Sequence, residues 1–236
     1  MKKIIFTVAA VVAIVGSSFA QKATLDNPWS LEGGINYSGA GGIDWKAPTV
    51  RARYFVNENI AVRAQLGLGD GLGTAMSEKY TFTEFGDGTG GEGTLDINRM
   101  AWNAQIGGEY HLAGTDRLSP YFALGLNFGG GSSKATTANS NGTAFVDGLS
   151  TERTGKFSMF GVGLGAGLDV YVIENLYLGL ELGINFDTYN YGEVENTTTV
   201  VAGGTTTITT AVTPGYKETY LSTGAMNAAF RLGWRF

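Results

Sequence analysis

The sequence predicts an all-β protein: an eight-stranded antiparallel up-and-down transmembrane β-barrel with short turns at one end and long loops at the other. Three observations support this fold. Eight segments alternate apolar residues with small or polar residues at a period of two. Glycines and charges share one face of these segments, whereas the other face is apolar or aromatic. The connections alternate between short and long, as in barrels that cross a membrane.

The predicted strands follow one another from residue 29 to the end of the chain. They are residues 29–37, about 49–56, 60–68, about 98–112, 120–128, 156–172, 176–186 and 216–236. The short connections are 57–59, 113–119 and 173–175, and the longer ones are about 38–48, 69–97, 129–155 and 187–215. A soluble β-sandwich would not explain why glycines and charges share one face, and a lipocalin-type barrel would turn its apolar face inward.

The first twenty residues are expected to be a cleaved signal peptide rather than part of the fold. Lys2 and Lys3 precede an apolar run at 4–15 that is too short to span a bilayer as a helix. The Ser18-Phe19-Ala20 sequence is a small-x-small cleavage site. Cleavage is favoured over an uncleaved N-terminal membrane anchor, so residues 21–236 are predicted to form one barrel domain.

Composition and charge exclude several classes of function. The chain has 37 glycines and no cysteine, so we expect neither disulfides nor thiolate metal sites. Its formal net charge of −5 argues against nucleic acid as a partner. Gly161, Gly163 and Ala166 have the spacing of a dinucleotide-binding fingerprint, but that motif requires a helix after the glycines, and here the strand pattern continues through them. The glycine-rich stretch 86–93 lacks a calcium-binding pattern, so no cofactor is predicted.

Ten charged residues fall on the small or polar face and therefore inside the predicted barrel. Charges removed from bulk water need partners, so we predict a network of Arg–carboxylate pairs with trapped water. Eight strands leave an interior only just wide enough for side chains, and the glycines at 161, 163, 165 and 167 are expected to make room. A sealed lumen is favoured over a narrow ion path. The ten residues are Glu32, Arg51, Arg53, Arg63, Arg99, Glu109, Asp169, Glu181, Arg231 and Arg235.

Aromatic residues near the predicted strand ends suit the belts that anchor barrels at the two membrane interfaces. They are Trp29, Tyr37, Tyr54, Trp102, Tyr110, Trp234 and Phe236.

Two further features lie outside this pattern. The single histidine, His111, is beside the short connection 113–119, the wrong end for an enzyme acting on outer-leaflet lipid, so we interpret it as a structural residue at the interface. Threonine-rich tracts at 197–199 and 205–210 flank Gly203-Gly204 and predict a hairpin that extends the barrel.

The last strand carries a resemblance to a known family. Met226, Ala228, Phe230, Leu232, Trp234 and Phe236 alternate with small or polar residues up to the final position. This stretch resembles the C-terminal assembly signal of bacterial outer-membrane β-barrel proteins, and residues 21–236 as a whole resemble the small barrels of the OmpA-transmembrane and OmpX type. The resemblance implies short periplasmic turns, long extracellular loops and recognition of the Phe236 strand by the barrel assembly machinery.

This resemblance leads to an expected function and one alternative. We expect a non-enzymatic integral protein of the Gram-negative outer membrane, a structural component of the envelope that contacts outer-membrane lipid and lipopolysaccharide. Its loops would face outward for surface contact or adhesion, with an extracellular ligand as partner. The alternative is a porin-like channel of low conductance for ions or small solutes, and the sequence does not separate the two.

Overall fold

The computed structural model describes residues 26–38, 42–68, 77–83, 91–141 and 145–236; within these, only the backbone is described at 35–38, 42–48, 77–78, 82–83 and 222–229. The described residues contain no helix long and apolar enough to span a membrane. The strands are β1 (Trp29–Ser38), β2 (Gly42–Phe55), β3 (Ile60–Leu68), β4 (Ser77–Thr83), β5 (Glu92–His111), β6 (Leu118–Ser140), β7 (Phe145–Ile173), β8 (Leu176–Tyr191), β9 (Val194–Ala202), β10 (Thr205–Thr213) and β11 (Tyr216–Arg235).

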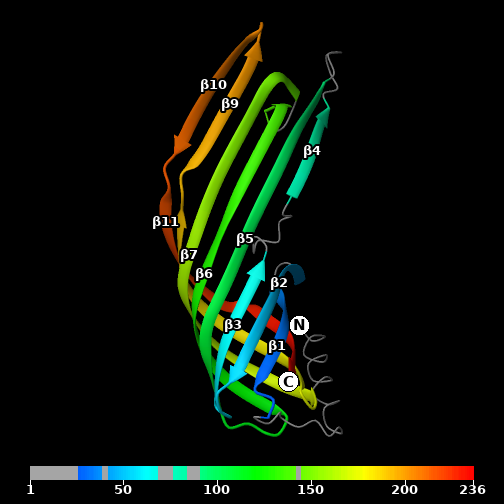
Figure 1. Cartoon of the computed structure of the whole chain (residues 1–236), viewed down its shortest axis with the longest axis vertical. Helices are drawn as coiled ribbons and strands as arrows, with labels where there is room; N and C mark the ends of the chain where they lie inside the picture. Colours follow the sequence, from blue (N-terminus) through cyan, green and yellow to red (C-terminus); the bar gives the residue numbers. More distant parts are fainter. Residues whose placement is uncertain (1–25, 39–41, 69–76, 84–90, 142–144) are drawn as a thin grey trace.

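Eight of these strands form a closed antiparallel ring, which confirms the predicted fold. The ring runs β1-β2-β3-β5-β6-β7-β8-β11 and closes where β11 pairs with β1 (Figure 1). Backbone hydrogen bonds between Trp29 and Phe236 extend this closing seam to the last residue. Every ring pairing is antiparallel, so the backbone groups of the paired residues bond to neighbouring strands around the whole wall.

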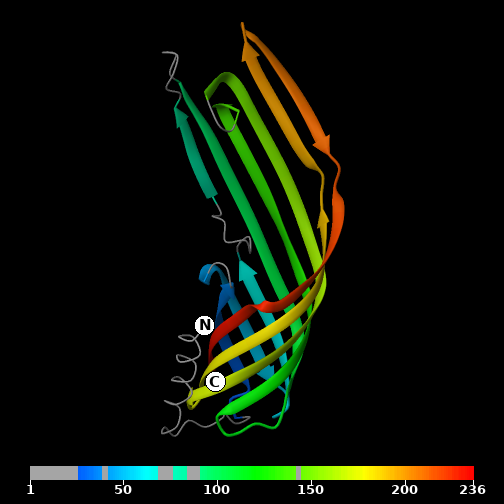
Figure 2. The same cartoon turned by 180° about the vertical axis from the view of Figure 1, so that it is seen from behind.

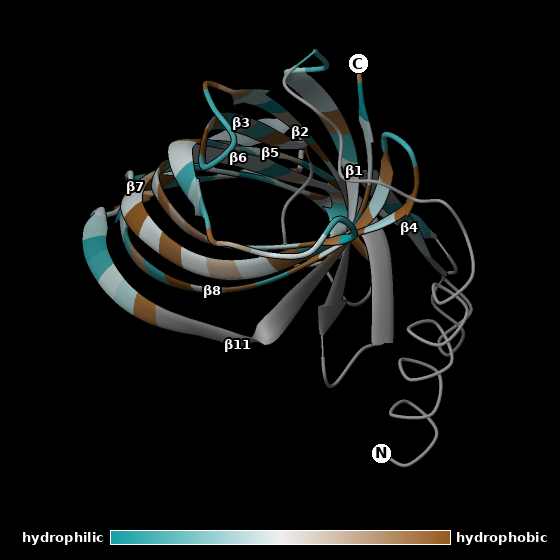
Figure 3. Cartoon of the chain, turned by 90° about the horizontal axis from the view of Figure 1, so that it is seen from below, coloured by the Kyte–Doolittle hydropathy of each residue, from teal (hydrophilic) through white to brown (hydrophobic). Residues whose placement is uncertain are grey.

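The period-two pattern separates the two faces of the ring as expected. On β6, Phe122, Leu124 and Leu126 point outward and stay exposed, whereas the alternating Tyr121 and Ala123 are buried inside. Figure 3 shows the same alternation as bands of brown and pale colour along β7 and β8. The exposed apolar residues therefore form the outer wall of the barrel, and its packed core lies inside the ring.

The longer connections differ from the prediction, because several of them are strands. The segment 129–155, expected as a loop, continues β6 and β7 as one paired hairpin beyond the ring. In the segment 187–215, β8 runs on to Tyr191 and the predicted threonine-rich hairpin is confirmed as β9 and β10. In the segment 69–97, β4 pairs with the first part of β5. These extensions contain many Ser and Thr residues, of which Thr favours strands, and they lack the apolar alternation that reveals an outer barrel wall.

Beyond the ring, these strands form an open sheet that we call the projecting sheet. Its order is β4-β5-β6-β7-β9-β10, and it rises from one side of the barrel as a curved blade (Figures 1 and 2). Because β5, β6 and β7 run from the ring into it, the inner face of the barrel continues as one face of the projecting sheet. Strand β10 lies at its edge, and all its residues are exposed.

An irregularity in β11 reverses which residues of that strand face inward. Gly224 pairs with Gly183 and Ala229 pairs with Glu181, so four residues lie between these pairs on β11 and only one on β8. The three extra residues shift the alternation by an odd number. As a result Tyr216 and Tyr220 share a face with Arg231, which an unbroken strand would place on the opposite side.

Candidate functional site

Glycines on β7 and neighbouring strands make the space that the charged interior occupies. A Cβ added at Gly163 would lie 2.5 Å from the Asn185 Oδ1 atom, and one at Gly179 would lie 2.7 Å from Arg231 Nη2. Gly167 faces the Tyr121 ring in the same way. The large polar side chains thus extend across the barrel over positions that carry no side chain, as the sequence pattern predicted.

Arg53 on β2 is the centre of the ionic interior and is fully buried. Its guanidinium lies 2.6 Å from Glu32, 2.9 Å from Glu109 and 2.8 Å from Asp169. These partners come from β1, β5 and β7, so this one side chain joins four strands across the lumen. Such charge-assisted contacts are the stronger class of hydrogen bonds.

Three more arginines complete the cluster. Arg51 and Arg63 bind Glu181 at 2.6 Å and 2.9 Å, and Arg63 also lies 3.2 Å from Glu109. Arg231 lies 2.7 Å from Glu32 and 3.3 Å from Asp169. We call these eight residues the ionic core: Glu32, Arg51, Arg53, Arg63, Glu109, Asp169, Glu181 and Arg231.

Two buried tyrosines join the ionic core, and the sequence analysis did not single them out. The Tyr121 hydroxyl donates to Glu181 at 2.6 Å and accepts a hydrogen bond from Arg231, and the Tyr177 hydroxyl donates to Glu32 at 2.7 Å. Their position on the inward face was the available signal. With Tyr121 from β6, every strand of the ring contributes a side chain, and the four arginines balance the four carboxylates.

A layer of amides lies above the ionic core, on the side of the projecting sheet. Gln105 donates to Asn127 at 2.7 Å, and Asn127 donates to Asn185 at 3.2 Å and to Asp187 at 3.0 Å. This chain of hydrogen bonds crosses β5, β6 and β8. The amide layer therefore lies along the inner wall on the side of β5 to β8, next to the ionic core.

The short-turn end of the lumen is closed by a third group of side chains. Arg235 donates to the Asn27 carbonyl at 3.0 Å, and its guanidinium lies 3.9 Å from the centre of the Phe55 ring. His111 is buried inside the barrel, so its predicted place at the interface is wrong. Its alternation with Glu109 on β5 puts both side chains on the inward face.

His111 connects a serine and a carboxylate in the order of a catalytic triad. Its Nδ1 lies 2.8 Å from Ser119 Oγ, and its Nε2 lies 3.1 Å from Glu109 Oε2. However, Ser119 is 0% exposed and His111 is 1% exposed, and Glu109 also binds Arg53 and Arg63. A nucleophile needs access to its substrate, so this geometry is that of a structural hydrogen-bond network.

The ten predicted lumen charges do not all meet in one place. The eight of the ionic core are joined as described, and Arg235 is buried at the short-turn end, with the Asn27 carbonyl and the Phe55 ring as neighbours. Arg99 lies beyond the ring of the barrel, where it lines a cavity near the start of the projecting sheet. It remains partly exposed, because β5 continues past the closed part of the barrel.

The aromatic residues predicted for the interface lie on the outer wall. Trp29 and Tyr54 are cross-strand partners whose rings are 4.8 Å apart. The side chain of Tyr37 lies outside the described residues. The others that the structure describes are exposed: Trp29, Tyr54, Trp102, Tyr110, Trp234 and Phe236.

A second aromatic group, which the sequence analysis missed, lines the inner wall where the barrel meets the projecting sheet. We call it the aromatic mouth: Phe157, Tyr189, Tyr191, Tyr216 and Tyr220. Tyr191 and Tyr216 stack with ring centres 4.7 Å apart, and Tyr220 meets Tyr189 edge-on at 5.6 Å. These rings line a cavity of about 930 Å³. Only the shifted alternation of β11 brings Tyr216 and Tyr220 to this face.

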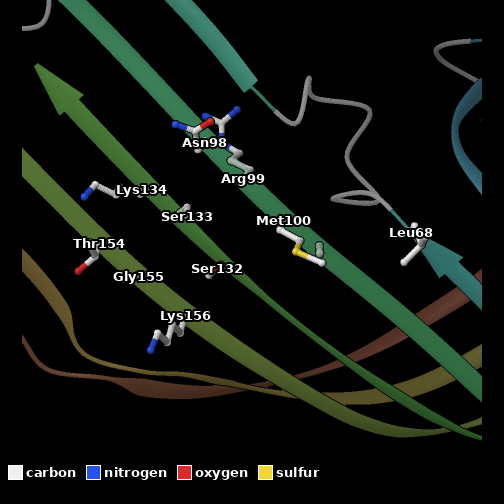
Figure 4. A pocket seen from close by; sticks show the side chains of 11 residues that line it. Leu68, Asn98, Arg99, Met100, Ser132, Ser133, Lys134, Thr154, Gly155 and Lys156 are labelled. Carbon is white, nitrogen blue, oxygen red and sulfur yellow. The ribbon is translucent and has the colours of Figure 1, made fainter.

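A smaller cavity of about 500 Å³ lies where β5, β6 and β7 leave the barrel (Figure 4). Met100, Lys134 and Lys156 line it and belong, by alternation, to the outward face. Arg99 lines it as well, so its lining includes residues of both faces, and Lys134 forms an ion pair with Glu152 at 2.9 Å. Among the described residues, no group of three or more His, Asp or Glu side chains is placed to hold a metal ion.

Comparisons with known proteins match this chain to one family and to solved structures of low identity. Residues 7–236 match the family described as outer membrane protein beta-barrel domain. Among solved structures, the N-terminal β-barrel domain of Pseudomonas aeruginosa OprF is 16% identical, with 88% of this chain and 96% of that chain covered and a TM-score of 0.35. A major outer membrane protein from Thermus thermophilus is 15% identical, with 88% and 98% covered and a TM-score of 0.43. Ail of Yersinia pestis is 12% identical, with 88% and 95% covered and a TM-score of 0.31. A search of curated proteins finds no match.

Proposed function

This chain belongs to the outer membrane protein beta-barrel domain family, and from that premise we propose that it is a non-enzymatic structural barrel with a closed lumen. The projecting sheet then serves as the part that contacts other molecules at the cell surface. The ionic core is the observation that carries this proposal, because together with Tyr121 it draws a side chain from every strand of the ring.

The ionic core opposes the passage of ions for a physical reason. Its charges are almost fully removed from solvent and are balanced by one another, so a passing ion would have to break contacts of 2.6–2.9 Å around Arg53 or Glu181. Breaking a buried pair typically costs about 3–5 kcal/mol. The amide layer above narrows the same bore from the side of β5 to β8.

Single-channel conductance of refolded residues 21–236 in a planar bilayer tests the closed lumen. The unmodified protein should show no steps above background. The double variant Arg51→Ala with Glu181→Ala removes one charge of each sign from the core and should produce discrete steps. The matched control, Glu193→Ala with Lys217→Ala, removes the same charges from exposed positions and should stay silent. Reproducible steps in the unmodified protein would instead support a low-conductance channel.

Lipopolysaccharide is the proposed partner of the outer wall. Lys156, and Lys134 in its exposed 2.9 Å ion pair with Glu152, offer cations where lipid phosphates would meet the barrel. Lys134→Ala with Lys156→Ala should lower the amount of lipopolysaccharide retained after extraction, while Lys79→Ala with Lys217→Ala, which removes the same charge at exposed positions, should not. Equal retention by both double variants would contradict this assignment.

Assembly and export are proposed from the two ends of the chain. Strand β11 closes the ring against β1 up to Phe236, which suits a strand that the barrel assembly machinery recognises. Phe236→Ser should slow insertion by that machinery, measured as the appearance of heat-modifiable, protease-resistant barrel. Cleavage after Ala20 predicts a mature protein that begins at Gln21, which mass spectrometry of the purified protein can check.

A further inference from the structure

We propose that the aromatic mouth is a binding site for an acidic oligosaccharide at the outer opening of the barrel. The inference rests on the proposed function only in that this opening faces the cell exterior. It requires neither a closed nor a conducting lumen.

The aromatic mouth is built from consecutive cross-strand rows. Phe157, Tyr191 and Tyr216 are direct partners on β7, β8 and β11 and form the outermost row. Tyr189 lies two residues below Tyr191 on the same face, with ring planes inclined by 16°. Tyr220 pairs in register with Asp187 one row further down. The rings therefore cover a continuous strip of the inner wall over three strands.

The position of this strip excludes a role in anchoring the barrel. Aromatic belts point outward to the membrane interfaces, whereas these rings share a face with Asp187 and the ionic core. Nor is the strip a packed core, since Tyr216 is 54% exposed and Tyr220 is 46% exposed. Inward-facing aromatic rings that stay open to water are most simply explained by a ligand that covers them.

The cavity offers the mixture of surfaces that a ligand site needs. Glycines face the aromatic strip: a Cβ at Gly131 would lie 2.5 Å from the Phe157 ring, so the glycine keeps this wall flat. Arg99 and Arg153 line the same cavity from β5 and β7. Asp187 also lines it but already accepts a hydrogen bond from Asn127 at 3.0 Å. The Glu218 carboxylate nearby accepts one from the Tyr220 hydroxyl.

These features together fit an acidic sugar better than other small ligands. A pyranose ring has a C–H face that stacks on an aromatic ring and an edge of hydroxyl groups that need polar partners. Tyrosines supply both kinds of contact at low cost in conformational entropy. The two arginines outnumber Asp187, the one carboxylate that lines the cavity, and they favour a carboxylate or sulfate on the ligand. A volume near 930 Å³ can hold a short oligosaccharide.

Calorimetric titration of the refolded protein in a detergent without a sugar headgroup tests this proposal. The probes are hexagalacturonate, which is acidic, and maltohexaose, which is neutral. Hexagalacturonate should bind the more tightly. Tyr216→Leu and Tyr220→Leu keep apolar bulk but remove the ring, and each should weaken binding roughly two- to tenfold. Arg153→Gln should weaken binding of hexagalacturonate but leave maltohexaose unchanged.

Tyr80→Leu is the matched control, since Tyr80 is a similarly exposed tyrosine of the projecting sheet outside this cavity. It should bind both probes like the unmodified protein. Absence of hexagalacturonate binding, or equal losses in the Tyr80 and Tyr216 variants, would overturn the proposal. Tighter binding of an oligothymidylate than of either sugar would overturn it too. Channel recordings on the same samples report on the lumen separately, so the two proposals can fail independently.

Discussion

Replacement of Arg53 by methionine tests whether the ionic core holds the barrel together. The change keeps an unbranched apolar stem but removes the guanidinium that contacts Glu32, Glu109 and Asp169 at 2.6–2.9 Å. Three arginines then face four carboxylates in a region closed to water. Removing one partner of a buried ionic contact costs about 3–5 kcal/mol, which is a large part of a typical unfolding free energy of roughly 5–15 kcal/mol.

Each of the three carboxylates has a second arginine partner, which limits the loss of stability in Arg53→Met and suggests a second substitution that restores part of it. Glu32 and Asp169 retain Arg231, at 2.7 Å and 3.3 Å, and Glu109 retains Arg63 at 3.2 Å. Asp169→Asn added to Arg53→Met removes the excess negative charge with little change in shape. We expect the double variant to recover about 1–3 kcal/mol relative to the sum of the two single changes, as coupled neighbours do.

The measurement is equilibrium unfolding in urea of refolded protein in lipid vesicles, followed by tryptophan fluorescence and analysed by linear extrapolation. Arg153→Met makes the same chemical change at an exposed position outside the ring and should alter the unfolding free energy by less than about 0.5 kcal/mol. If Arg53→Met were no more destabilising than Arg153→Met, or if Asp169→Asn brought no rescue, the ionic core would be hydrated and dispensable.

Three further changes test separate parts of the structure. Ser119→Ala leaves buried His111 without its 2.8 Å hydrogen-bond partner and should lower the unfolding free energy by about 1–3 kcal/mol in the same assay. The unmodified protein should not hydrolyse a p-nitrophenyl ester. Hydrolysis by the unmodified protein that is lost in the Ser119→Ala variant would contradict the structural role. Gly107→Ala would place a Cβ 2.8 Å from the Gly125 Cα and should destabilise the barrel by about 1–3 kcal/mol. Gly33→Ala is the control and should not change stability, because no atom lies within 4 Å of its added Cβ. Equal destabilisation by the two variants would refute the close approach at Gly107. Gly203 and Gly204 have φ values of 56° and 78°, which valine adopts poorly, so replacing both by valine should speed hydrogen exchange in β9 and β10. The unfolding midpoint of the barrel should not change. A shifted midpoint would show that the hairpin stabilises the ring.

The sequence predicted the wall of this barrel well because the wall obeys a local rule. Side chains alternate across a strand, and an outward face that meets an apolar environment must be apolar throughout. The pattern in Phe122, Leu124 and Leu126 therefore identifies both the strand and its outer face. The same rule assigned Arg53 and Glu109 to the interior before any contact was known.

Most strands of the projecting sheet were not predicted from the sequence, because the projecting sheet has water on both faces. Threonine-rich β9 and β10 pair through their backbones, as Thr199 does with Ile208, without any apolar stripe to mark a face. Only the hairpin turn at Gly203-Gly204 gave a recognisable signal. The extension of β6 and β7 past the ring had no comparable marker.

The amino-acid sequence by itself determined which segments form the barrel wall, the two faces of that wall and the charged character of the interior, since each follows from residues two positions apart. Only the tertiary structure decided which charges meet: Arg231 and Glu32 are 199 residues apart and become partners because the ring closes between β11 and β1. Only the tertiary structure shows the register shift in β11, which places Tyr216 and Tyr220 in the aromatic mouth. Strand register depends on pairing across the whole ring, so the sequence of a single strand does not determine it.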